Sequence, residues 1–353
     1  MLGLAALCGV GGPVRAMPRT ALAASWQAGP DYRVGVLQVD PGRALRVANE
    51  LDVPGRAHGL LVEPAGTLLT VARRPGDWLL RWDRTGRTIA WRWIEPGRAF
   101  TGHVLNSFDG ATVFTTELDL ETGAGLVGVR EAGSLRKRDE WPTHGIDPHE
   151  LIQDPADGNR LFVANGGVQT RPESGRVKRD LARMDSSLAW LDARSGELLG
   201  QWRLEDRRLS LRHLAWNRAD GRTVMGIALQ AEHDDPATRD SSPVLALFDG
   251  ATLRVAPAGT ALAGYGGDIA ACGGGFAVSC PRAQCVTVHD ANGTWRGLVP
   301  LAEACPLAAT SGRVWAGGRG VAETWSAGKD SQPEEKSAHP LPDIRLDNHW
   351  IGI

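Results

Sequence analysis

The stretch Thr143-His-Gly-Ile-Asp-Pro-His-Glu-Leu151 places two histidines and two carboxylates directly before a short apolar strand, which ends at a turn of small and polar residues. The same pattern, a histidine followed by a short apolar strand and a turn, starts at His58, His103 and His213. A pattern that recurs at intervals of about fifty residues indicates a fold made of repeated units.

The repeats predict short strands and almost no helix. Each repeat contains runs of apolar and β-branched residues, separated by turns rich in Gly, Pro and Asp. Units of about forty to fifty residues with four strands each are typical of β-propeller blades. In four repeats an aspartate ends the third run, where its side chain can cap the following turn. These residues are Asp83, Asp192, Asp249 and Asp290.

The number of units predicts the number of blades. Six repeats are evident between residues 58 and 325, residues 32–57 add further strands, and the tail 344–353 could close the ring. We therefore predict an all-β protein, a seven-bladed β-propeller with four-stranded blades, and keep six blades as the alternative. The charged segment 327–338 is expected to be a poorly ordered linker.

The N-terminus resembles an export signal. Residues 1–12 are apolar, and small residues at 21–24 offer a cleavage site, although the usual charged start is missing. A disordered tail is the alternative. We expect residues 1–25 to be a truncated export segment, residues 26–353 to form a single propeller domain, and the protein to be periplasmic.

Composition bears on the kind of partner. The formal net charge of −2 gives no electrostatic reason to expect nucleic acid. Beyond the N-terminus no stretch of the sequence is long and apolar enough to span a membrane. The sequence contains no nucleophile elbow, phosphate-binding loop or dinucleotide fingerprint. We expect a monomer.

Four of the five cysteines fall late in the chain, at Cys272, Cys280, Cys285 and Cys305. In an oxidising compartment they could form one or two disulfides, and buried thiols are an equally good interpretation. Their spacing does not match a CxxC zinc pair.

The repeat predicts a set of side chains around one axis. The first strand of every blade lines the central channel of a propeller, so residues at one repeat position converge. That position holds His58, His103, His149, His213, Asp268 and Cys305. Imidazole, carboxylate and thiolate groups ligate transition metals, and iron or copper is the expected ion. A haem or an anionic ligand would also suit several histidines, and ordinary channel polarity is the structural alternative.

Other polar residues are expected to support this ring from behind. They flank the ring position or end neighbouring strands, and they are Glu117, Asp119, His144, Glu150 and Asn165. A basic loop at 171–183 is a second candidate site, suited to a protein partner.

The string His144-Gly-Ile-Asp-Pro-His-Glu-Leu151, followed by Val163-Ala-Asn-Gly-Gly167, resembles an exported bacterial family, domain of unknown function 1513 (DUF1513). Further matching stretches include Gly102-His103, Leu211-Arg-His-Leu214 and Asn348-His-Trp350. The resemblance implies a periplasmic propeller with a twin-arginine (Tat) signal, encoded beside imelysin-like proteins in iron-responsive gene clusters. The twin arginines are absent from residues 1–20.

Three functional hypotheses follow. The leading one is a non-enzymatic periplasmic propeller that binds a metal or metal chelate at its channel mouth and assists iron or copper acquisition, with imelysin-like proteins as partners. The second is a metal-dependent enzyme on the same scaffold, with Glu117 or Glu150 as a base. The third is a protein-interaction platform that uses the basic loop.

Overall fold

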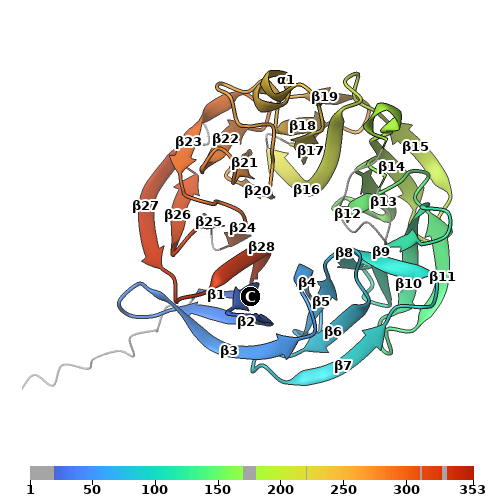
Figure 1. The fold of residues 1–353 in the computed structure, drawn as a ribbon, viewed down its shortest axis with the longest axis horizontal. Helices are drawn as coiled ribbons and strands as arrows, with labels where there is room; N and C mark the ends of the chain where they lie inside the picture. The colour runs from blue at the N-terminus through green and yellow to red at the C-terminus, as the bar shows by residue number, and fades with distance from the viewer. Residues whose placement is uncertain (1–19, 170–179, 220, 311, 328–331) are drawn as a thin grey trace, which may run out of the picture.

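A computed structural model describes residues 20–169, 180–219, 221–310, 312–327 and 332–353. Its strands form seven four-stranded antiparallel sheets, arranged as blades around a central axis (Figure 1). This confirms the predicted seven-bladed β-propeller. Helix in the described ranges is limited to α1 (Pro236–Ser241) and one 3-10 turn (Leu181–Arg183), neither of which could cross a membrane.

Six blades are formed by consecutive strands, and the first strand of each lies nearest the axis. The first three blades consist of β4 (Ala57–Val62), β5 (Leu68–Ala72), β6 (Trp78–Trp82) and β7 (Thr88–Trp93); β8 (Arg98–Asn106), β9 (Thr112–Asp119), β10 (Gly125–Glu131) and β11 (Lys137–Pro142); and β12 (Pro148–Asp154), β13 (Asp157–Asn165), β14 (Ser187–Asp192) and β15 (Leu198–Trp202). The next three consist of β16 (Leu209–Ala219), β17 (Arg222–Ala231), β18 (Leu245–Phe248) and β19 (Leu253–Val255); β20 (Ile269–Cys272), β21 (Gly275–Cys280), β22 (Cys285–Asp290) and β23 (Trp295–Pro300); and β24 (Leu307–Thr310), β25 (Arg313–Gly317), β26 (Val321–Ala327) and β27 (Pro333–Pro340).

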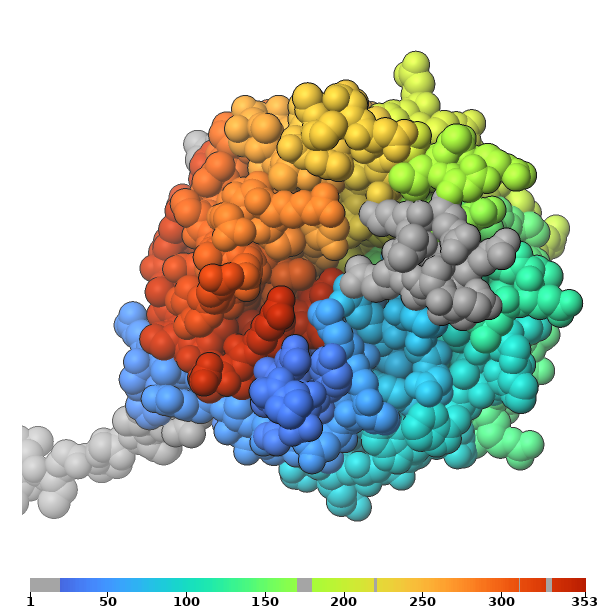
Figure 2. Space-filling view, in the orientation of Figure 1, coloured from blue at the N-terminus to red at the C-terminus, as the bar shows by residue number. Residues whose placement is uncertain are grey.

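The seventh blade joins the two ends of the chain. Its order from the axis outward is β28 (Arg345–Gly352), β1 (Ala21–Ala28), β2 (Asp31–Val39) and β3 (Leu45–Val53). Strands β28 and β1 pair antiparallel, and Figure 2 shows the red C-terminal segment beside the blue N-terminal segment. The ring is therefore closed by hydrogen bonds between two strands more than 300 residues apart in sequence.

The propeller begins earlier than the predicted boundary at residue 26. Strand β1 starts at Ala21, and Leu22, Ala23 and Ala24 are fully buried in it. The small apolar residues that suggested a cleavage site thus pack in the seventh blade. The remaining part of the predicted export segment, residues 1–19, lies outside the described residues.

The prediction of a poorly ordered linker at 327–338 is wrong for most of these residues. Residues 333–340 form β27, the outermost strand of the sixth blade. Five of its eight residues are exposed, which explains the charged composition that suggested a linker. A charged outer edge also discourages pairing with another chain.

The predicted aspartate caps are present at the turns after the third strands. The Asp83 Oδ1 accepts the backbone N–H groups of Thr85 and Arg87 at 3.0 and 3.2 Å. Asp192, Asp249 and Asp290 accept backbone N–H groups in the same way. These caps satisfy backbone donors of exposed turns and so help to set where each outer strand begins.

The apolar core lies between the blades. Seven clusters of buried side chains occur, one at each contact between neighbouring sheets. The contact between the sixth and seventh blades contains Trp26, Trp315 and Trp350. Each inner strand also contacts the next one around the ring. Because the apolar faces of the sheets pack against one another between the blades, polar side chains can line the central axis.

The four late cysteines are free thiols in the structure. Cys280 and Cys285 lie opposite one another on β21 and β22, at the end of a hairpin. Of the two interpretations that the sequence left open, the described residues therefore show free thiols and no disulfide.

Candidate metal centre

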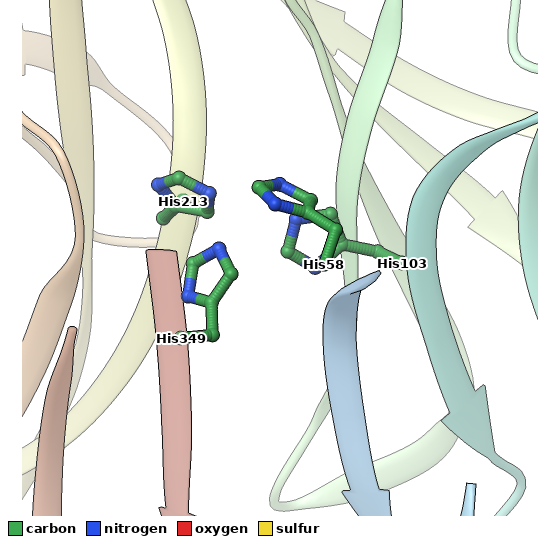
Figure 3. Close-up of side chains that lie close together, drawn as sticks. All are labelled: His58, His103, His213 and His349. Atoms are coloured by element: carbon green, nitrogen blue, oxygen red, sulfur yellow. The ribbon is translucent and has the colours of Figure 1, made fainter. Parts of the chain in front are cut away.

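Five histidines converge on the axis from five different blades. They are His58 on β4, His103 on β8, His149 on β12, His213 on β16 and His349 on β28, and all five are buried. Figure 3 shows His213 and His349 facing His58 and His103 across the channel. One ring nitrogen from each of these four lies within 4.8 Å of the other three. The fifth ring is close by, with 2.8 Å between His149 Nε2 and His213 Nε2.

Each of the five strands carries a bulge at its histidine. On four of these strands the register with the neighbouring strand shifts across the histidine: Ala57 to Leu60, Phe100 to Val104, Pro148 to Leu151 and Leu211 to Leu214. On β28 the shift lies between Leu346 and Trp350, which pair with Trp26 and Ala24 of β1. A bulge adds an unpaired residue to one strand and re-aims its side chain. The bulges therefore release the histidines from the regular alternation of the sheet.

Glycine permits the close approach of the rings. Gly102 has a φ of 121°, and a Cβ at this position would lie 2.5 Å from His58 Cδ2. A Cβ on Gly59 would lie 2.6 Å from the carbonyl oxygen of Gly102. The glycines that flank His58 and His103 in the sequence thus leave the room that the imidazoles occupy.

Burial sets the charge state of the cluster. Desolvation lowers the pKa of His58, His103, His149 and His213 well below the ordinary value, and neighbouring imidazoles lower it further. These four rings are therefore neutral at pH 7. A neutral imidazole has a free lone pair, which is the form that binds a metal.

Two carboxyl groups stand behind the rings. Asp268 Oδ2 lies 3.1 Å from His349 Nδ1. Burial alone lowers the pKa of His349, but the charge and hydrogen bond of Asp268 raise it overall. Glu150 Oε1 lies 3.6 Å from His103 Nδ1, and burial raises the pKa of Glu150 to about 8. In both histidines the other nitrogen, Nε2, has no hydrogen-bond partner among the described residues, and the pair of Asp268 and His349 has the arrangement of a carboxylate-supported metal ligand.

Several ring nitrogens lack a hydrogen-bond partner within the described part of the chain. They are both nitrogens of His58, Nε2 of His103 and His349, and Nδ1 of His149 and His213. Buried polar atoms are normally satisfied, so this concentration of unsatisfied donors and acceptors indicates a ligand. With metal–nitrogen bonds of about 2.1 Å, two ligands on one ion are roughly 3 to 4 Å apart. The four nitrogens lie within 4.8 Å of one another, slightly wider than this spacing, so the residues fit a metal if the rings close slightly around it.

The six predicted ring residues have three different environments. The four histidines are brought together. Asp268 lies behind the cluster, against His349, and accepts the Leu307 N–H at 2.8 Å. Cys305 instead lines a neighbouring cavity of about 870 Å³ together with Arg56. Burial and the nearby carboxylates raise the pKa of Cys305 to about 12, so the thiol stays protonated and is a weak donor.

One of the predicted supporting residues contacts the cluster, and a second holds the loop before β12. Glu150 contacts His103, and its Oε2 accepts the backbone N–H of Leu214 at 2.6 Å. Asn165 is fully buried, and its Nδ2 donates to the carbonyl of Thr143 at 3.0 Å. Asn165 thus holds the loop that precedes β12, from which the third blade presents its histidine.

The other three supporting candidates are engaged elsewhere. Glu117 forms ion pairs with Arg130 and Lys137 at 2.7 and 2.6 Å within the second blade. Asp119 caps a turn by accepting two backbone N–H groups. His144 is exposed. Glu117 and Asp119 lie on β9, the second strand of its blade, and His144 lies in the loop before β12, so none of the three is on a strand that lines the axis. Most of the basic loop, 171–179, lies outside the described residues.

Sequence reasoning missed His349 and Arg212. His349 occupies the ring position of the seventh blade, and the expectation of a closing strand at 344–353 was the signal that could have found it. Arg212 precedes His213, is 1% exposed, and donates from Nη1 to Asp147 Oδ2 at 2.9 Å. The family-like stretch Leu211-Arg-His-Leu214 contains Arg212, but its role could not be predicted from it, because the environment of Arg212 is built from three blades.

Seven four-stranded blades around a buried group of imidazoles define the chain as a β-propeller with a histidine-lined hub. The chain belongs to the family described as protein of unknown function DUF1513, whose model matches residues 51–353. No curated protein matches the chain in sequence.

Solved structures share the fold at low sequence identity. A candidate 6-phosphogluconolactonase from Bacteroides fragilis superposes with a TM-score of 0.67 at 14% identity, covering 97% of this chain and 100% of that one. Virginiamycin B lyase from Staphylococcus aureus gives 0.59 at 9% identity, covering 84% and 92%. Hydrazine synthase from Kuenenia stuttgartiensis gives 0.58 at 14% identity, covering 82% and 90%. At these identities the likeness shows the propeller fold alone.

Proposed function

We propose that the histidine cluster binds a transition-metal ion, with iron and copper as the expected ions. The observation that carries this proposal is the group of four buried imidazoles whose nitrogens lie within 4.8 Å of one another. The lowered pKa values of His58, His103 and His213, which keep these three rings neutral, and the unpartnered nitrogens support it. Imidazole donors suit iron, copper and zinc, and the carboxylate of Asp268 would orient His349 and increase its basicity.

We further propose that the protein is exported to the periplasm and takes part in iron or copper acquisition, with imelysin-like proteins as partners. The family resemblance and the apolar residues 1–12 support this role.

The test is the metal content of the purified protein after exposure to Fe²⁺ or Cu²⁺, measured by elemental analysis. We expect about one ion per chain in the wild type and none in a His103→Ala/His349→Ala double variant. His289→Ala is the matched control, because His289 is also buried but bonds to Thr287 and Gly293 in the fifth blade. A wild type that takes up neither ion, or a double variant that keeps it, would contradict the proposal.

A metal-dependent enzyme is the second candidate. It is favoured by Glu150, whose pKa of about 8 suits a group that exchanges protons near neutral pH, beside His103. Oxygen consumption by the Fe²⁺-loaded protein with a reductant should then fall strongly in Glu150→Gln while the iron content stays unchanged. Oxygen consumption no faster than that of free Fe²⁺ would rule this reading out.

A further inference from the structure

A small cavity lies between the histidine cluster and a group of arginines. Its volume is about 20 Å³, and His58, His149 and His213 form one side of it. Arg73, Arg74 and Arg212 are among the residues that line the rest. A cavity of this volume admits about one water-sized group. The site therefore combines neutral metal-binding rings with fixed positive charge.

Arg212 is the buried cation of this cavity. Its side chain is 1% exposed, and its Nη1 donates to Asp147 Oδ2 at 2.9 Å. Within the described residues, Nε and Nη2 of Arg212 have no hydrogen-bond partner. Burial lowers the pKa of Arg212, against the opposing effect of Glu232 and Tyr265. A buried guanidinium with unused donors is costly unless an acceptor binds there.

The local backbone is built to hold Arg212 in place. A Cβ on Gly166 would lie 2.7 Å from Asp147 Oδ2 and 2.9 Å from Arg212 Nη1. Asp147 is itself shared, because its other oxygen pairs with Arg74. One carboxylate is thus shared between two guanidiniums beside the rings, and the negative charge of Glu232 also acts on Arg212. Glycine at 166 thus makes room for a charged pair that faces the metal-binding cluster.

We propose that this cavity binds a small oxygen-donor anion, such as formate or bicarbonate, which bridges the guanidinium of Arg212 and the metal ion of the proposed function. One oxygen would fill the water-sized space, and the fork of donors on Arg212 matches a carboxylate group. The anion would also supply the negative charge that the neutral imidazoles do not. Metal and anion therefore bind with positive coupling, each raising the affinity for the other. This inference rests on the proposed metal site.

The test compares Cu²⁺ affinity with and without formate, by competition against a chromophoric chelator. Formate should raise the affinity of the wild type about tenfold. In Arg212→Lys the gain should vanish while binding without formate persists. Arg130→Lys is the matched control, since Arg130 is also 1% exposed but pairs with Glu95 and Glu117 in the second blade. Sulfate, which is tetrahedral and larger than formate, should give no gain.

Three outcomes would overturn the inference: no effect of formate on the wild type, an equal effect in Arg212→Lys, or loss of the effect in Arg130→Lys. If Arg212→Lys does not fold, Gly166→Ala serves instead, because its Cβ displaces the same pair. A wild type without bound metal contradicts the proposed function separately. In that case the anion site is tested by measuring the Tm of the metal-free protein with and without formate. A rise in Tm that requires Arg212 supports the anion site, and the absence of a rise overturns it.

Discussion

A histidine at the hub gains its properties from its place in the strand. The bulges at His58, His103, His149 and His213 turn the rings toward the axis, and burial keeps them neutral. His349 differs, because Asp268 raises its pKa. One residue type therefore supplies both neutral rings and one ring that is oriented by a carboxylate.

The role of Asp268 can be tested by Asp268→Asn. We expect the affinity for Cu²⁺ to fall about 10- to 100-fold, because the amide cannot stabilise the ring of His349 as a carboxylate does. Competition titration measures the change. Asp290→Asn, which alters a turn cap in the same blade, should leave the affinity unchanged. Equal effects of the two substitutions would show that Asp268 acts only through the fold.

Gly102→Ala tests whether glycine makes room for the cluster. The new methyl group would collide with His58 at a backbone angle that also disfavours alanine, so we expect metal content to be lost. Gly97→Ala is the control, because Gly97 has a φ of 75° but nothing within 4 Å of a Cβ. It should cost only about 1 to 2 kcal/mol of unfolding free energy and retain the metal. Metal retained in Gly102→Ala would count against the predicted clash.

At the scale of the strand, position across the blade decides what a polar residue does. The inner strands carry the histidines, whereas Glu117 on β9 links β10 and β11 through Arg130 and Lys137. On the outermost strands charge is exposed, as on β27. Polar residues of similar type therefore have different roles according to their distance from the axis. They form the candidate metal site on the inner strands, buried ion pairs on the middle strands and an exposed edge on the outermost strands.

Glu117→Gln separates a structural brace from support of the metal site. Arg130 and Lys137 would lose their shared buried partner, and we expect the free energy of unfolding to fall by about 3 kcal/mol. Denaturant unfolding measures the loss. Metal content at full occupancy should not change, since the contacts of Glu117 lie within the second blade. Loss of metal in a folded Glu117→Gln variant would instead show that Glu117 supports the metal ligands.

The whole molecule depends on the closure of the ring by β28. This strand completes the seventh blade, contacts β4 and β24, and brings His349 to the hub. The metal site and the closure of the fold therefore share one strand near the end of the chain.

Deletion of residues 343–353 should abolish both. The inner edge of β1 would lose its partner, and we expect aggregation on size-exclusion chromatography and loss of a single cooperative unfolding transition. His349→Ala should keep the monomer and the cooperative transition but lose metal. A truncated chain that unfolds as the wild type does would show that closure is not needed for the fold.

The sequence by itself determined the repeat, and with it the propeller, the number of blades and four of the hub histidines. Strand periodicity and turn residues are local signals, and equivalent positions in equal repeats must meet at one axis. Only the tertiary structure decided the rest. His349 was missed because its blade is split between the two ends of the chain, so no complete seventh unit exists in the sequence. The surroundings of Cys305, Glu117 and Arg212 depend on contacts within and between blades. These contacts involve residues distant in sequence, so the sequence did not predict them.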